Sequence, residues 1–131
     1  MKMINGQVYV GHFKNDMFDG PGRLYLPNGI IFEGEFYQGK CPSIGYILYS
    51  NGSLYFGQHN EFIKHGKGKK CYYDGSIYEG EWENDRKNGK GRMEYGESGN
   101  IYIGDFLEDK RGGKGCFYNK EKDEVYEGDW F

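Results

Sequence analysis

A repeated spacing of aromatic and glycine residues constrains this chain more than any other feature. Tyr78 and Gly80, followed by Gly89 and Gly91, recur along the 131 residues at steps of 23 or 24. The pattern aromatic-x-Gly followed by Gly-x-Gly occurs in five copies, and its glycine columns are broken once, by Ser43. A fixed period of this size indicates a repeat array. We therefore expect a single elongated domain, 1–131, with repeats at 6–28, 29–51, 52–74, 75–98 and 99–122 and a partial sixth at 123–131.

Within a repeat, the residues alternate as a β-strand requires. Tyr78, Gly80 and Trp82 share one parity and so face one side of an extended strand, whereas the glutamates between them face the other side. Turn signals such as Asn51-Gly52 and Asp74-Gly75 separate the runs, and such pairs favour tight hairpins. The sequence therefore predicts an all-β fold, a single-layer twisted antiparallel meander of consecutive β-hairpins that stack like a solenoid.

The core of such a strip must come from a few large side chains. Hydrophobic residues make up 37% of the chain, but aromatic residues reach 18%, and each ring buries a large area. The first strands are predicted at 8–14, 22–26, 31–37 and 46–49. The predicted core is the set of apolar residues on the aromatic face: Tyr9, Phe13, Leu24, Leu26, Phe32, Phe36, Ile47, Tyr49, Tyr55, Tyr72, Tyr78, Trp82, Met93, Tyr95, Tyr102, Phe106, Phe117, Tyr126 and Trp130.

The repeat also carries a family resemblance. Around Tyr78 it reads Asp-Gly-Ser-x-Tyr-Glu-Gly-Glu-Trp and closes with Gly-Lys-Gly. This pattern resembles the MORN repeat (membrane occupation and recognition nexus), and the resemblance extends from Gly6 to Phe131. Departures are Phe32, Ser43 and His59. The resemblance implies a scaffold in a cytoskeletal, ciliary (axonemal) or membrane-linked assembly, or an accessory segment of the kind found fused to enzymes.

The sequence shows no arrangement typical of a catalytic, metal or nucleotide site. The histidines lack partners at metal-ligand spacing, and the Gly-Lys-Gly segments lack the rest of a phosphate loop. Three cysteines without a pattern favour a reducing compartment. A net charge of −3 opposes binding to nucleic acid. We therefore expect a non-enzymatic protein without cofactor or metal, in the cytoplasm and associated with the cytoskeleton or a cilium.

The strand face opposite the aromatic columns gives the main prediction of a binding site. This face is polar in repeat four but apolar in repeats two and three. Apolar groups on an exposed face mark an interaction site, and we expect a helix or an extended peptide of a larger assembly to bind there. The alternative is that curvature or a loop covers them. The predicted partner-binding residues are Tyr37, Tyr46, Leu48, Leu54, Phe56, Cys71 and Tyr73.

A row of lysines suggests an alternative function. Lys67, Lys90 and Lys114 stand between the two glycines of three successive Gly-x-Gly segments. Clusters of lysine attract phosphoinositide head groups, so a membrane-surface binding module is the alternative to a protein scaffold. A solvated row of loop lysines is the simpler interpretation, and we expect membrane contact to be weak at most.

The last strand suggests a site of assembly. Residues 125–131 end the chain as a strand with aromatic residues at its close, and its edge residues are Val125, Trp130 and Phe131. An open apolar edge favours pairing with another strand, so we expect an end-to-end homodimer or a larger assembly. A frayed terminus is the alternative.

Overall fold

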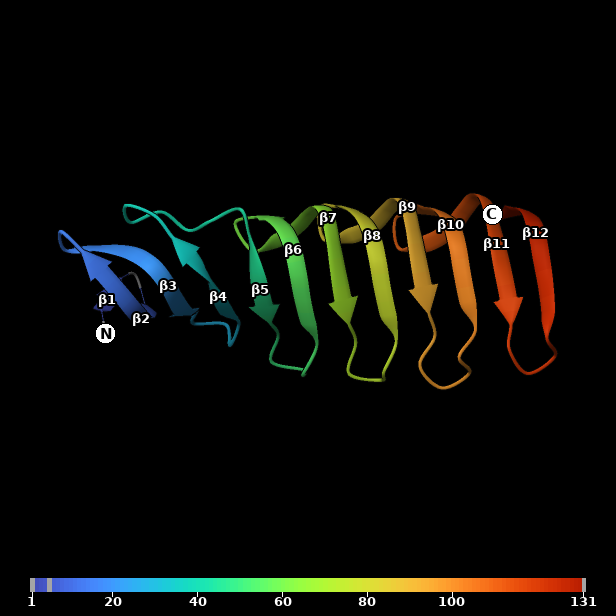
Figure 1. Cartoon of the computed structure of the whole chain (residues 1–131), viewed down its shortest axis with the longest axis horizontal. Helices are drawn as coiled ribbons and strands as arrows, with labels where there is room; N and C mark the ends of the chain where they lie inside the picture. The colour runs from blue at the N-terminus through green and yellow to red at the C-terminus, as the bar shows by residue number, and fades with distance from the viewer. Residues whose placement is uncertain (1, 5, 131) are drawn as a thin grey trace.

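The computed structural model describes residues 2–4 and 6–130. Twelve strands in this part of the chain form one open antiparallel sheet in chain order (Figure 1), which confirms the predicted single-layer meander. The strands are β1 (Lys2–Ile4), β2 (Gln7–Lys14), β3 (Met17–Tyr25), β4 (Ile31–Phe36), β5 (Ile44–Leu48), β6 (Leu54–Asn60), β7 (Ile63–Cys71), β8 (Ile77–Glu83), β9 (Arg86–Glu94), β10 (Ile101–Leu107), β11 (Lys110–Asn119) and β12 (Glu124–Trp130).

The strands are joined by turns of two kinds. The predicted turns between repeats are present, and Asn51 and Asp74 each accept the backbone N–H of the serine two residues later at 2.9 Å. The second kind was not predicted. Asn84 and Asp85 have φ of 48° and 71° and close a two-residue hairpin of type I′, and the pairs 15–16, 61–62 and 108–109 do the same. In the four repeats that have such a turn, the Gly-x-Gly segment follows the turn and lies inside a long strand rather than in a loop.

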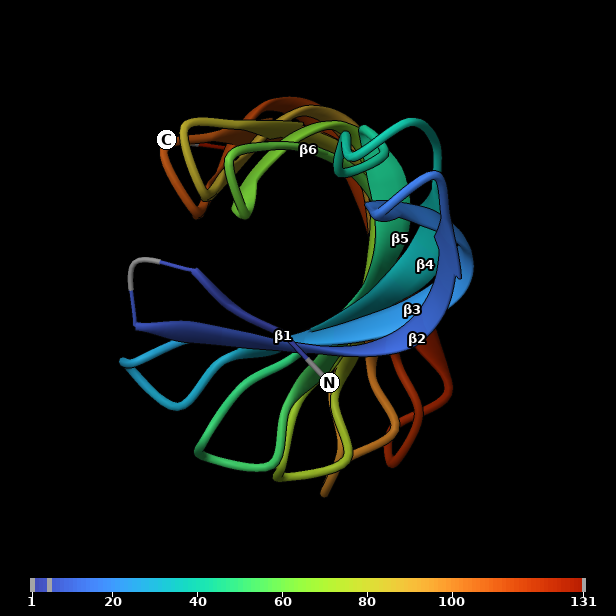
Figure 2. The same cartoon turned by 90° about the vertical axis from the view of Figure 1, so that its left-hand side faces the viewer.

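Each long hairpin bends toward its aromatic face. The ring centroids of Tyr78 and Trp82 are 4.9 Å apart, although four residues of an extended strand span about 13 Å. The Tyr78 hydroxyl donates to the Glu81 carbonyl oxygen at 2.8 Å and so holds the bend. The register of β8 and β9 shifts between Gly80 and Trp82, which forms a bulge at this point. Viewed from one end in Figure 2, the bent sheet has the outline of an open C.

The rings fill the inside of this bend and form the core. Phe32, Tyr55 and Tyr78 have no exposed surface, and the predicted core residues are buried or half-buried, with two exceptions. Phe13 is 40% exposed and Tyr126 is 45% exposed, so these two predictions were wrong. Both lie at the ends of the sheet. β1 pairs with β2 only at residues 7–9 and leaves Phe13 without a neighbour on that side, and β12 pairs with β11 alone among the described residues.

Candidate partner-binding surface

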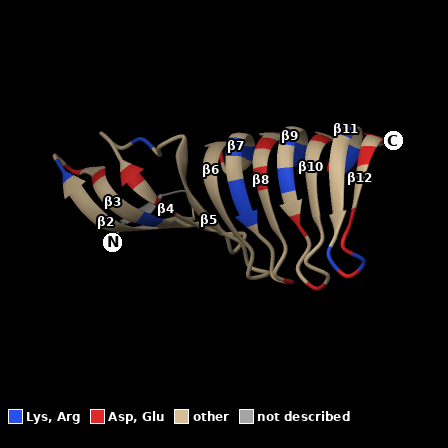
Figure 3. Ribbon diagram, turned by 45° about the vertical axis from the view of Figure 1, so that its right-hand side comes forward, with Lys and Arg blue, Asp and Glu red and all other residues tan. Residues whose placement is uncertain are grey.

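The outer face, opposite the buried rings, is apolar where β5 and β6 lie side by side. These two strands contain no Lys, Arg, Asp or Glu, and Figure 3 shows them as an uncoloured region beside the charged strands β7 to β9. Tyr46 pairs with Phe56 and Leu48 pairs with Leu54, and the two rings lie 4.5 Å apart between centroids. The four side chains are 37–48% exposed, so a compact apolar group faces solvent.

The structure brings together five of the seven predicted partner-binding residues. Tyr46, Leu48, Leu54 and Phe56 form the compact group, and half-buried Cys71 pairs with Leu54 from β7. The other two lie apart from the group. Tyr37 pairs with Lys40 beside the turn that follows β4, and Tyr73 lies in the turn between β7 and β8. Neither curvature nor a loop of the described chain covers the group.

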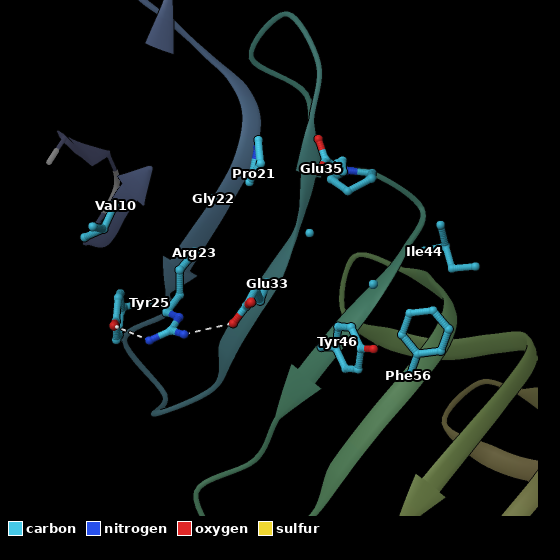
Figure 4. A pocket seen from close by; sticks show the side chains of 13 residues that line it. Val10, Pro21, Gly22, Arg23, Tyr25, Glu33, Glu35, Ile44, Tyr46 and Phe56 are labelled. Atoms are coloured by element: carbon cyan, nitrogen blue, oxygen red, sulfur yellow. Dashed lines mark hydrogen bonds and ion pairs between the residues drawn. The ribbon is translucent and has the colours of Figure 1, made fainter. Parts of the chain in front are cut away.

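A cavity of about 620 Å³ extends this surface toward β2 (Figure 4). Arg23 and Glu33 reach toward each other inside it and form an ion pair at 2.9 Å. Glycines contribute only backbone to its floor. Val10 and Ile44, which sequence reasoning missed, belong to its walls, although they share the parity of Tyr46 and could have been found by the same alternation. The lining also contains the acidic residue Glu35, and the walls are completed by further apolar and aromatic side chains: Pro21, Tyr25, Pro42, Tyr46 and Phe56.

A second cavity of about 550 Å³ shares Ile44 and Phe56 with the first and continues across β7 and β8. Both cavities follow a line of glycines that crosses the sheet. Gly22 pairs with Gly34, and Gly45 pairs with Gly57, which pairs with Gly68, which pairs with Gly80. We call this line, from Gly22 on β3 to Gly80 on β8, the glycine furrow.

Two lysines of the column, Lys67 and Lys90, border this furrow, and the column alternates with acidic residues. All three lysines are exposed. Lys90 forms an ion pair with Asp105, Lys67 lies opposite Glu81 and Lys114 lies opposite Asp129. The column is therefore not a uniform basic stripe, and binding to lipid head groups stays a prediction. No helix in the described part of the chain is long and apolar enough to span a membrane.

A second column of cations lies inside the bend, and sequence reasoning missed it. Lys64 is 3% exposed; its Nζ lies 2.5 Å from the Asp85 carboxylate and 5.0 Å from the ring centroids of Tyr49 and Trp82. Lys87 and Arg111 occupy the same position in the next repeats, and each lies over three rings. The one sequence signal was a cation two residues before each of the last three Gly-x-Gly segments. These cations hold neighbouring repeats together by cation–π contacts.

His59 replaces the large ring of the other repeats and serves packing. It is 7% exposed, stacks on Phe62 and accepts the Phe62 backbone N–H on Nδ1 at 3.1 Å. Burial lowers the pKa of its imidazole, which favours the neutral form. Among the residues that the structure describes, no three His, Cys, Asp or Glu side chains gather in a way that could hold a metal ion.

The structure describes two of the three residues of the predicted assembly edge. Val125 on β12 is 59% exposed. Trp130 is half-buried and packs onto the repeat before it, because its Nε1 donates to the Gly115 carbonyl oxygen at 3.2 Å. Phe131 lies outside the described residues. Assembly through this edge stays a prediction.

Comparison with known proteins identifies the repeat. The family model of the MORN repeat matches residues 9–31, 63–77, 78–99 and 102–120, which is more than half of the chain. The chain belongs to the MORN-repeat family. No curated protein matches the sequence. The unmatched stretch 32–62 holds β5, β6 and all three departures from the MORN pattern, so the apolar part of the outer face lies where that pattern is weakest.

Proposed function

We propose that this MORN-repeat protein is a non-enzymatic scaffold or adaptor that docks a protein partner on the outer face of β5 and β6. The observation that carries the proposal is the group of Tyr46, Leu48, Leu54 and Phe56, which face solvent on two strands without a charged residue. Contiguous exposed apolar side chains favour a protein interface. From the family we infer a place in a cytoskeletal, ciliary or membrane-linked assembly of the cytoplasm.

A phosphoinositide-binding module is the second candidate, and the lysine column is the observation that favours it. Its weakness is the acidic residue opposite or paired with each lysine of the column. Attraction to an anionic surface needs an excess of positive charge within a Debye length, which is about 8 Å at physiological salt. We therefore rank protein docking first.

A quantitative pull-down from the native source tests the proposal. Leu48→Asp and Phe56→Asp place a charge in the apolar group and are expected to remove the partners that the unaltered protein recovers. Ile103→Asp is the matched control, because Ile103 is 55% exposed and stands in the same repeat column as Phe56. If the Leu48→Asp and Phe56→Asp proteins recover the same partners as the unaltered protein, this surface is not the binding site. Salt-resistant binding to phosphoinositide vesicles that is lost when Lys67, Lys90 and Lys114 become Ala would favour the second candidate.

A further inference from the structure

The width of the glycine furrow limits what can enter it. Its two walls come from alternate residues of the same strands, such as Ile44 and Tyr46 on β5 or Lys67 and Lys69 on β7. Alternate residues of a strand lie about 6.6 Å apart, whereas a helix with its side chains is about 10–12 Å across. The furrow therefore has room for an extended chain and not for the body of a helix.

The floor of the furrow limits how an extended chain can bind. Gly57, Gly68 and Gly80 pair with one another in the middle of the sheet, so their backbone N–H and C=O groups are used in the ladder. A ligand cannot add here as a further β-strand. It must contact the side chains of the walls while its own backbone stays solvated, as in a polyproline-II-like conformation.

The charge along the furrow changes from one end to the other. Over β5 and β6 the walls are apolar, and beyond them lie the neutral Arg23–Glu33 pair and the acidic residue Glu35. On β7, neither the Lys67 nor the Lys69 ammonium forms an ion pair among the described residues, although Lys67 lies opposite Glu81 and Lys69 lies opposite Glu79 on β8. The other two charged groups of this cavity are engaged: Lys90 pairs with Asp105, and the Glu81 carboxylate accepts the Lys90 backbone N–H.

We infer that the docked segment is extended and acidic at one end, with apolar residues over β5 and β6 and carboxylates beside Lys67 and Lys69. The inference rests on the proposed docking function and names the class of its partner. The two cavities are adjacent and share Ile44 and Phe56, so one segment of a partner protein that passes over these two residues reaches both. Carboxylates at the β7 end complement the two unpaired ammonium groups.

Selection of binding peptides tests this inference. Random 16-residue peptides displayed on phage are selected on the immobilised full chain, and the strongest binder is synthesised with a fluorescent label for anisotropy titrations. We expect apolar residues next to a run of Asp or Glu. The double change Lys67→Glu and Lys69→Glu should weaken binding by about tenfold, and by less at high salt. The matched control is Lys110→Glu, which changes an exposed lysine outside the furrow.

A proline placed at the centre of the selected peptide distinguishes an extended peptide from a helical one. An extended segment should keep its affinity within about threefold, whereas a helix would lose about a hundredfold, since proline costs a helix about 3 kcal/mol. A helical peptide whose binding depends on Phe56 but not on the two lysines would overturn this inference and leave the docking function standing. Peptides that bind the Phe56→Asp protein as well as the unaltered one would place the ligand elsewhere and overturn both.

Discussion

Repeats two and four have the same spacing of aromatic and Gly-x-Gly positions, yet they form different hairpins. Six residue pairs join β8 to β9, on both sides of the bulge, whereas three pairs join β4 to β5. Phe32 and Tyr78 are nevertheless equally buried, with no exposed surface. The difference shows that burial of the ring and closure of the hairpin are separate properties of this fold.

Two substitutions explain why the hairpin of repeat two stays open. In repeat four, Gly89 has a φ of 100° at the bulge, and Gly20, Gly66 and Gly113 have similar positive values. Ser43 occupies this column in repeat two, and a residue with a Cβ is strained in that conformation. Pro42 precedes it and has no N–H to donate to the ladder. The Ser43 carbonyl oxygen instead accepts the His59 backbone N–H at 2.9 Å, which directs the segment toward β6.

The third substitution removes the hydroxyl that holds the bend. Tyr78 donates to the carbonyl oxygen of Glu81, and Tyr9, Tyr55 and Tyr102 make the corresponding bond in their own repeats. Phe32 cannot. The open hairpin leaves Pro42 and Ile44 on the wall of the larger cavity, and Ile44 stands in the column that holds lysines in the later repeats. The repeat that departs from the pattern is therefore the one that shapes the proposed site.

Removal of the rings gives the largest expected effect. Phe32→Ala and Tyr78→Ala should each lower the free energy of unfolding by roughly 3–5 kcal/mol, because each leaves a cavity in the core. Urea unfolding followed by tryptophan fluorescence measures the loss. Similar losses would confirm that ring burial does not depend on hairpin closure. A loss below about 1 kcal/mol for Phe32→Ala would break the comparison and show that repeat two contributes little to the core.

Substitutions at the bulge position should have an intermediate effect on stability, and this effect should differ between the hairpins of repeats two and four. Gly89→Ala should cost about 1–2 kcal/mol, because φ is 100° and the new Cβ would meet the Glu81 carboxylate. Ser43→Gly should give no gain in stability, since Ser43 is exposed and has no positive φ whose strain a glycine could relieve. Thermal unfolding by circular dichroism measures both. A gain for Ser43→Gly as large as the loss for Gly89→Ala would mean that Ser43 is held in the same strained conformation, and it would remove our explanation of the open hairpin.

Most of the fold followed from the sequence because its determinants are local. The 23-residue period and the alternation around Tyr78 predicted the strands, the single layer and nearly all of the core. The turn Glu61–Phe62 was missed because neither residue is a usual turn former, and their positive φ values come from the hairpin around them. The burial of Lys64 was missed because its partner Asp85 lies 21 residues away.

The candidate site was predictable in part, for a similar reason. The parity of Tyr46 and Phe56 placed both on the outer face. Their contact, however, depends on the register between β5 and β6. The cavity beside them depends on the way that Pro42 and Ser43 open repeat two, a tertiary effect that the alternation of single strands does not contain.

The smallest expected effect on stability comes from the contacts that anchor the hairpin turns of repeats four and two. In repeat four, the Asp85 carboxylate accepts the backbone N–H of Lys64 at 3.1 Å and pairs with its ammonium. In repeat two, Gly39 takes the equivalent place and donates its N–H to the Phe18 carbonyl oxygen at 2.7 Å, without a charge. Burial alone would raise the pKa of Asp85, but the hydrogen bonds and the charge of Lys64 outweigh it and hold the pKa below its ordinary value of 3.8.

An acid titration of stability tests this difference. Because the pKa of Asp85 is lower in the folded protein, its contribution is present above about pH 4 and is lost as the pH falls through the folded value. Asp85→Asn keeps an acceptor but removes the charge, so it should cost about 0.5–1 kcal/mol at pH 7 and less near pH 2.5. Glu97→Gln, at an exposed turn position, is the control and should cost little at either pH. A loss for Asp85→Asn that persists at pH 2.5 would show that geometry rather than charge anchors the turn of repeat four, and the two turns would then differ in shape alone.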